Sequence, residues 1–297
     1  VGPRLSEVDS TFTRFVAGIK GTVAGWDIDS ALLYSQNKVS NKLDGYLQRD
    51  VAFALLNPTA ANVAAASLNP AYAALPAGSV WRIAENAGLN SPALYAALSP
   101  RISNDARTHI AQIDFKANRE IGKLDGGALG VAVGAEFRHE ATELKPTTGT
   151  ERGNIIGLGY SAYKGSRNAS AIYAEVLAPV LKNLELSGAL RADHFTDVGN
   201  SYTPKVGVKW TPVRELALRG TFAKGFRAPS AAENGVGGLA AFSTASDPLR
   251  CALGVEAACD PAPIAVITSP NPRLSPERSR SYSVGAVWDP LPRTSIS

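Results

Sequence analysis

The sequence has 297 residues, a formal net charge of +4, 45% hydrophobic residues, 27 Gly, 19 Pro and no Met. The small positive charge forms no Lys/Arg block, which excludes nucleic acid as an expected partner. There is no sustained helical period, and the scattered Gly and Pro favour many strands and turns over one helical core. Because Met is missing even from position 1, we expect an internal piece of a longer polypeptide with no signal peptide to inspect.

The first predicted elements form a hairpin. Residues 12–22 and 26–36 each alternate apolar and polar side chains, with a tight turn between them. A long irregular stretch, 39–104, follows, and residues 51–81 within it carry no charge. Prolines interrupt this uncharged segment, so it favours a large loop with short helical pieces over a membrane-spanning helix.

The remaining predicted strands follow with the same period of two. They are 107–119, 128–142, 170–178, 184–194, 202–211, 216–226 and 280–288, with Asp289 to Arg293 as a turn into a tenth strand. Short turns alternate strictly with longer loops, which include 143–168 and 227–277. Antiparallel strands send alternate connections to opposite ends, so the long loops are expected to gather at one end.

This asymmetry predicts an all-β fold, a transmembrane antiparallel β-barrel with long extracellular loops and short periplasmic turns. Strands of about 9 to 11 residues suit a tilted crossing of the bilayer. Trp26, Trp210 and Trp288 each lie near a short turn, where membrane-interface aromatics form a girdle. A soluble β-sandwich, such as a secreted binding protein, needs equally apolar inner faces and stays open as an alternative.

Two motifs flank the loop 227–277. A strand that begins at Leu216 runs into Gly225-Phe226-Arg227-Ala228-Pro229-Ser230, and Asn271-Pro272-Arg273-Leu274-Ser275-Pro276-Glu277-Arg278-Ser279 leads into Ser281-Tyr282-Ser283-Val284-Gly285. In this order, the motifs resemble a barrel segment of TonB-dependent outer-membrane receptors, in which a strand rises into an extracellular loop and the chain returns into the next strand. By this resemblance, residues 1–297 are part of one barrel domain.

The resemblance implies a barrel of about 22 strands, of which this chain supplies about ten. We expect the plug domain and the C-terminal strands to lie outside the chain. The implied function is that of a Gram-negative outer-membrane receptor that imports a scarce ligand, such as a ferric siderophore or cobalamin, with energy from TonB. The implied partners are membrane lipid, the TonB system through the missing plug, and a small-molecule or metal-chelate ligand. A monomer without a cofactor is expected for the full-length protein. A passive porin-like channel shares the barrel and stays open as an alternative.

Cys251 and Cys259 are the only cysteines, and both fall in the loop 227–277. A nearby pair with no other cysteine predicts one disulfide in an oxidising compartment. Metal ligation is the weaker interpretation, because the three His lie far away in the sequence.

No motif predicts catalysis or a metal site, since the sequence has no P-loop, no nucleophile elbow and no His pair with metal-ligand spacing. The expectation is therefore a protein that is not an enzyme. The candidate ligand- or plug-facing residues are charges on the polar faces or at the loop root: Arg227, Arg219, Glu233, Arg191 and Asp193. Most polar-face charges are expected to form structural cross-strand pairs. For Arg227 two interpretations stay open, contact with plug or solute, or an ion pair with Glu233 that fixes the base of the loop.

Overall fold

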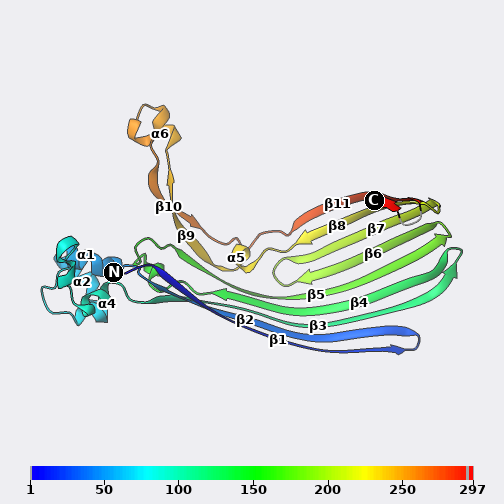
Figure 1. Cartoon of the computed structure of the whole chain (residues 1–297), viewed down its shortest axis with the longest axis horizontal. Coiled ribbons are helices and arrows are strands. Elements are labelled where there is room, and N and C mark those ends of the chain that lie inside the picture. The colour runs from blue at the N-terminus through cyan, green and yellow to red at the C-terminus, as the bar shows by residue number, and fades with distance from the viewer. Residues whose placement is uncertain (1, 292–293, 297) are drawn as a thin grey trace.

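The computed structural model describes residues 2–291 and 294–296, and it contains one twelve-stranded antiparallel sheet with short helices beyond one end of it (Figure 1). The strands are β1 (Leu5–Val23), β2 (Trp26–Asp44), β3 (Ile102–Leu124), β4 (Gly127–Leu144), β5 (Tyr160–Leu181), β6 (Leu184–Phe195), β7 (Gly199–Val213), β8 (Leu216–Arg227), β9 (Val236–Ala245), β10 (Ala262–Thr268), β11 (Glu277–Leu291) and β12 (Thr294–Ile296). The helices are α1 (Arg49–Leu56), α2 (Ala60–Ala66), α3 (Pro70–Ala73), α4 (Pro92–Leu98), α5 (Ala231–Asn234) and α6 (Pro248–Ala252), with 3-10 helices η1 (Ala84–Leu89), η2 (Thr150–Arg152) and η3 (Glu256–Ala258).

Ten of the twelve strands form a wall in sequence order, β1 to β8 followed by β11 and β12. This arrangement confirms the predicted all-β fold of about ten antiparallel strands. Within the described residues β1 pairs only with β2, so the wall is open and corresponds to part of a barrel. All twelve strands belong to one sheet, whereas a β-sandwich consists of two sheets packed face to face. The alternative prediction of a β-sandwich is therefore wrong.

The wall strands are longer than the sequence predicted. From β1 to β11 they contain 12 to 23 residues, instead of about 9 to 11. Beyond the apolar band both faces become polar, so the period of two fades while the ladder continues. Ser6 Oγ, for example, donates to Asn41 Oδ1 across β1 and β2 at 2.8 Å. The turn predicted at Asp289 to Arg293 begins too early, since β11 continues to Leu291. The predicted tenth strand is confirmed as β12, which pairs with β11, and residues 292–293 lie outside the described part of the chain.

The connections at the two ends of the wall differ strongly in length. Four two-residue turns at one end are 24–25, 125–126, 182–183 and 214–215. Ala24 and Gly25 both have positive φ, 51° and 78°, which is typical of the hairpin turn whose twist matches the strands. The connections at the other end are 45–101, 145–159, 196–198 and 228–276. The predicted strict alternation of short turns and long loops fails at 196–198. This link at the long-loop end has only three residues, because β6 and β7 remain paired up to Phe195 and Gly199.

The two faces of the wall have opposite chemistry. One face, here called the apolar face, carries large hydrophobic side chains that the register places side by side and that are exposed to the surroundings. They include Phe15, Leu32, Ile113, Phe137, Ile172, Leu190, Val206, Tyr282 and Val284. The opposite face, here called the polar face, carries most of the charged side chains of the strands. An exposed apolar surface of this extent is typical of a protein that is covered by another apolar phase.

A helical cap, residues 45–101, covers the long-loop end of β2 and β3 (Figure 1). Its core consists of Val51, Ala52, Leu55, Leu94, Ala97 and Leu98, with Trp81 among the side chains packed against it. Pro70 and Pro92 lie in the first helical turns, where proline is tolerated, so prolines that rule out one long helix begin short ones. The predicted loop with short helical pieces is confirmed. It is shorter than the predicted 39–104, because β2 continues to Asp44 and β3 begins at Ile102. Among the described residues, no helix has the length and apolar character needed to cross a membrane.

An arm projects from the wall between β8 and β11 (Figure 1). It consists of β9 and β10, which pair from Ala245 opposite Ala262 to Leu239 opposite Thr268, with α6 and η3 at its tip. Residues 236–240 also pair with β5, which joins the base of the arm to the wall. The sequence prediction missed this hairpin, because the alternation in 236–245 is obscured by small residues on both faces.

We predict that the buried cluster holds the cap together. Leu98→Ala removes a fully buried side chain and should destabilise the cap by about 2 to 5 kcal/mol. Leu68→Ala is the matched control, because Leu68 is 83% exposed. Amide hydrogen exchange of residues 49–98 should rise in the first variant only, with the wall strands unchanged. Equal protection in the two variants would contradict the role of this cluster.

Candidate functional site

A ladder of charged groups crosses the polar face from β4 to β6. Arg191 donates from Nε to Asp193 Oδ1 at 2.9 Å and from Nη2 to Glu136 Oε2 at 3.4 Å. Arg138 donates from Nη1 to the other Glu136 oxygen at 3.2 Å, and Glu140 lies 3.2 Å from Arg138 Nε. Asp193 is 7% exposed, and its Oδ2 has no hydrogen-bond partner among the described residues. Arg191 and Asp193 therefore belong to a cross-strand network in which one buried oxygen of Asp193 has no partner among the described residues.

Tyr173 lies flat on the wall between these charges. The Arg191 guanidinium is 5.9 Å from the centre of its ring, a cation–π distance. A Cβ at Gly134 would overlap the tyrosine ring, so this strand position requires glycine. The Tyr173 ring, Glu136 and Arg191 line a hollow of about 590 Å³ on the polar face, together with Lys116 and Lys205.

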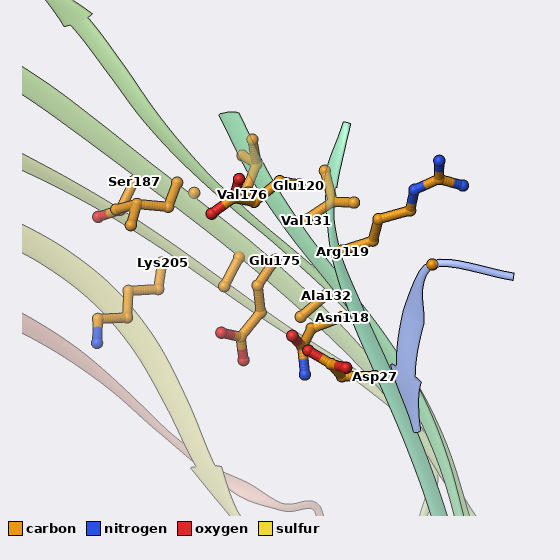
Figure 2. Close-up of a pocket in the computed structure, with 15 residues that line it drawn as sticks. Asp27, Asn118, Arg119, Glu120, Val131, Ala132, Glu175, Val176, Ser187 and Lys205 are labelled. Atoms are coloured by element: carbon orange, nitrogen blue, oxygen red, sulfur yellow. The ribbon is translucent and has the colours of Figure 1, made fainter. Parts of the chain in front are cut away.

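A second hollow, of about 670 Å³, lies nearer the short turns (Figure 2). Figure 2 shows Glu175 between Asp27 and Asn118 on one side and Lys205 on the other. Arg119 points away from them, because successive strand residues face opposite sides of the sheet. The side chains of this hollow can hydrogen-bond a polar segment or solute. The alternation of polar and apolar residues along the strands predicts that the side chains of this hollow lie on the polar face. No sequence motif identifies them as a binding site.

Arg227 is held by two carboxylates at the end of β8. It donates from Nη1 and Nη2 to both oxygens of Glu233, at 3.0 and 2.9 Å. It also donates from Nε and Nη2 to Glu277, at 3.0 and 2.6 Å. Glu233 accepts a further bond from the Ser230 N–H, which closes the capping box of α5. The Arg227 side chain and this N–H lower the pKa of Glu233 to about 2. We call this group the loop-root clamp.

A second anchor joins the same loop to the neighbouring wall. Arg167 in β5 pairs with Glu140, lies 3.5 Å from Asp197 Oδ2, and donates to the Pro229 carbonyl at 2.7 Å. Asn234 in α5 donates to Asp197 at 2.9 Å. No sequence pattern indicates the role of Arg167, because its partners lie on β4, on the 196–198 link and in the loop. Both Arg227 and Arg167 therefore fix the base of the arm.

The remaining candidate residues lie apart from this anchor. Arg219 is on the polar face, and its side chain lies over Gly285 of the paired strand. A Cβ at position 285 would be 3.0 Å from the Nε of Arg219. Trp26, Trp210 and Trp288 lie near the two-residue turns, with Trp210 opposite Leu184 and Leu218. Cys251 and Cys259 form a disulfide at the tip of the arm, with an S–S distance of 2.07 Å.

The β-barrel domain model of TonB-dependent receptors matches residues 5–297. The chain belongs to this family. Its sheet is accordingly part of a barrel in the outer membrane of a Gram-negative bacterium, the short turns are periplasmic, the long loops are extracellular, and the polar face lines the lumen. No protein in the curated sequence collections matches the chain.

Solved structures with the same fold include siderophore receptors and a peptide importer. The ferric enterobactin receptor PfeA of Pseudomonas aeruginosa is 14% identical, with a TM-score of 0.56, and the match covers 94% of this chain and 32% of that one. The siderophore receptor PirA of Acinetobacter baumannii is 15% identical, with a TM-score of 0.54 and coverages of 94% and 33%. The RagAB peptide importer is 11% identical, with a TM-score of 0.53 and coverages of 96% and 28%. The chain spans about a third of the length of these structures.

The loop-root clamp should resist acid down to about pH 2. The pKa of Glu233 lies below its ordinary value of 4.5, so its contribution to stability is complete above 4.5 and is lost as the pH falls through about 2. In Arg227→Gln the pKa should return toward 4.5, and the loop root should open at a higher pH. Pepsin cleavage within 228–235, measured from pH 5 to 1.5, reports the opening.

Arg273→Gln is the matched control for this measurement, because Arg273 is a loop arginine with no ion pair among the described residues. It should cleave as the wild type does. If the pH at which half of the protein is cleaved is the same for Arg227→Gln and the wild type, the proposed role of the loop-root clamp is wrong.

The disulfide should stiffen the tip of the arm without affecting the wall. The cysteines are 8 residues apart, so chain entropy gives a local stabilisation of about 2 to 3 kcal/mol. Replacing both cysteines by serine should raise hydrogen exchange in 247–260 and leave the melting temperature of the barrel nearly unchanged. Two free thiols in the mass spectrum of the oxidised, folded protein would show that the bond does not form.

Proposed function

We propose that this chain forms part of the wall and ligand mouth of a receptor that imports a scarce small molecule or metal chelate with energy supplied through TonB. The observation that carries the proposal is the combination of a charged lumen wall with extracellular loops anchored to it by Arg227 and Arg167. The proposed partners are the TonB system, a plug domain that fills the lumen, and membrane lipid around a monomer.

A ferric chelate is the ligand class that we propose. Two of the similar structures are a siderophore receptor and a ferric enterobactin receptor, which supports this class, whereas RagAB is a peptide importer. The lumen wall offers both signs of charge, with Lys116, Arg191 and Lys205 near Glu136 and Glu175. Such a wall suits a polar ligand of either sign. We propose that the receptor binds and moves its ligand without chemical conversion, and therefore is not an enzyme.

Uptake of radiolabelled iron chelates tests the proposal. Cells that express the complete receptor should import ferric enterobactin or a ferric hydroxamate only when TonB is present. A labelled oligopeptide is the comparison ligand. Uptake that is equal with and without TonB would favour a passive channel, and TonB-dependent uptake of the peptide alone would overturn the ferric-chelate class.

A further inference from the structure

The register of β3 and β4 brings two histidines together on the apolar face. Ala111 lies opposite His139, so His109, two residues further along β3, is diagonal to His139. Both histidines share the face of Phe137, because alternate residues of a strand point to one side of the sheet. Their ring centres are 5.6 Å apart, and the ring planes make an angle of 37°. We call these two residues the histidine pair.

The separation of the two rings suits a single metal ion between them. The bond from a metal to an imidazole nitrogen is about 2.0 to 2.1 Å long, so the ring centre lies about 3.2 Å from the ion. Two imidazoles at a tetrahedral angle then have ring centres about 5.2 Å apart. The observed 5.6 Å is close to this value. The histidine pair therefore has the spacing of a two-imidazole metal site.

Asn168 holds His139 in the orientation that such a site needs. It lies directly opposite His139 on β5, and its Oδ1 is 2.7 Å from His139 Nδ1. An amide oxygen can only accept a hydrogen bond, so Nδ1 carries the proton and Nε2 keeps its lone pair. Metal-ligating histidines are commonly held by such a bond from the other ring nitrogen. Among the described residues no hydrogen bond engages the ring of His109.

Imidazole is the nitrogen or sulfur ligand that this chain can offer to a metal. The sequence has three His, two Cys and no Met, and Cys251 and Cys259 are joined in the disulfide. The third histidine, His194, is held by Asn200 Oδ1 at 2.7 Å from its Nδ1, but it has no second imidazole beside it. The described residues contain no group of three or more His, Cys, Asp or Glu that could hold a metal ion. Water therefore has to complete the coordination of an ion at the histidine pair.

The histidine pair lies above the apolar band of the wall. His109 is 15 residues from Leu124, which ends β3 at the periplasmic turn. At about 3.4 Å per residue and a strand tilt of about 40 to 45°, this distance corresponds to a height of about 35 to 40 Å. The apolar band of an outer-membrane barrel is about 25 Å tall. Both histidines are half-buried, so ions from the external medium can reach the rings.

We propose that His109 and His139 bind one divalent transition-metal ion of the Zn²⁺, Ni²⁺ or Cu²⁺ class on the outer surface of the barrel, with Asn168 as a positioning residue. Imidazole suits these metals. The ion would join β3 to β4 outside the lumen, so the site is separate from the path of an imported ligand and does not depend on the proposed function. Arg107 lies two residues from His109 on the same face, and its positive charge opposes the binding of a cation there.

Titration of the complete, untagged receptor in detergent with Cu²⁺, followed by EPR, tests the site. The wild type should bind a Cu²⁺ ion with two nitrogen ligands. His109→Gln and His139→Gln should each bind it at least about tenfold more weakly and lose one nitrogen from the spectrum. Asn168→Ala should weaken binding by about tenfold and keep both nitrogens, because it removes only the orienting hydrogen bond. Arg107→Gln should bind more tightly, because a like charge is removed.

His194→Gln and Asn200→Ala are the matched controls. They remove the isolated imidazole and its amide partner from the same face, and both variants should bind Cu²⁺ as the wild type does. Heat-modifiable migration in SDS gels checks that every variant remains folded. The proposal is overturned if His139→Gln has the affinity and spectrum of the wild type, or if His194→Gln loses as much affinity as His139→Gln.

Discussion

The pairing of backbone polar groups is the constraint on which this structure depends. A bilayer core offers no hydrogen-bond partner, and each unpaired N–H or C=O costs several kcal/mol there, so the strands must satisfy one another. The ladder from Leu5 opposite Asp44 to Val23 opposite Trp26 is uninterrupted. The register shifts in β3, β5 and β7 fall at Glu120/Gly122, Pro179/Leu181 and Trp210/Val213, all next to periplasmic turns. Pro179, which has no N–H to donate, is thus placed where pairing already changes.

The same ladder separates the chemistry of the two faces, since neighbouring residues point to opposite sides. Arg227 and Arg278 lie near each other on paired strands, yet Arg227 faces two glutamates at the lumen mouth and Arg278 faces the membrane side. The lumen charges satisfy one another, as Arg191, Asp193 and Glu136 do. On the other face, Lys42 pairs with Glu7 and Asp9 near the extracellular end of β1 and β2. One alternating pattern therefore specifies both a wall for solute and a surface for lipid.

Local alternation was sufficient to predict the wall, because burial against one apolar phase imposes a period of two on every strand. The strand ends could not be predicted, since residues such as Ser6 and Asn41 pair above the membrane, where neither face has to be apolar. The hairpin of the arm was missed for a related reason, as its strands are nearly all small or exposed. For Arg227 the sequence suggested the Glu233 partner, but not Glu277, which is 50 residues away and becomes adjacent only through the β8–β11 register. Arg167 depends on three separate segments and has no local signal at all.

The extracellular segments are held by two different physical means, and this difference determines which of them can move. The cap has its own core, in which Leu55 and Leu98 are almost completely buried, so its displacement would proceed as a unit or would expose apolar surface. The arm has no buried cluster among the described residues. It is held at its base by the short pairing of residues 236–240 with β5 and by ion pairs, which contribute little each when exposed. Its disulfide restricts the tip alone. Rearrangement of the arm therefore requires less free energy than rearrangement of the cap, and a loop that must close around a ligand has to come from the part of the mouth that is weakly held.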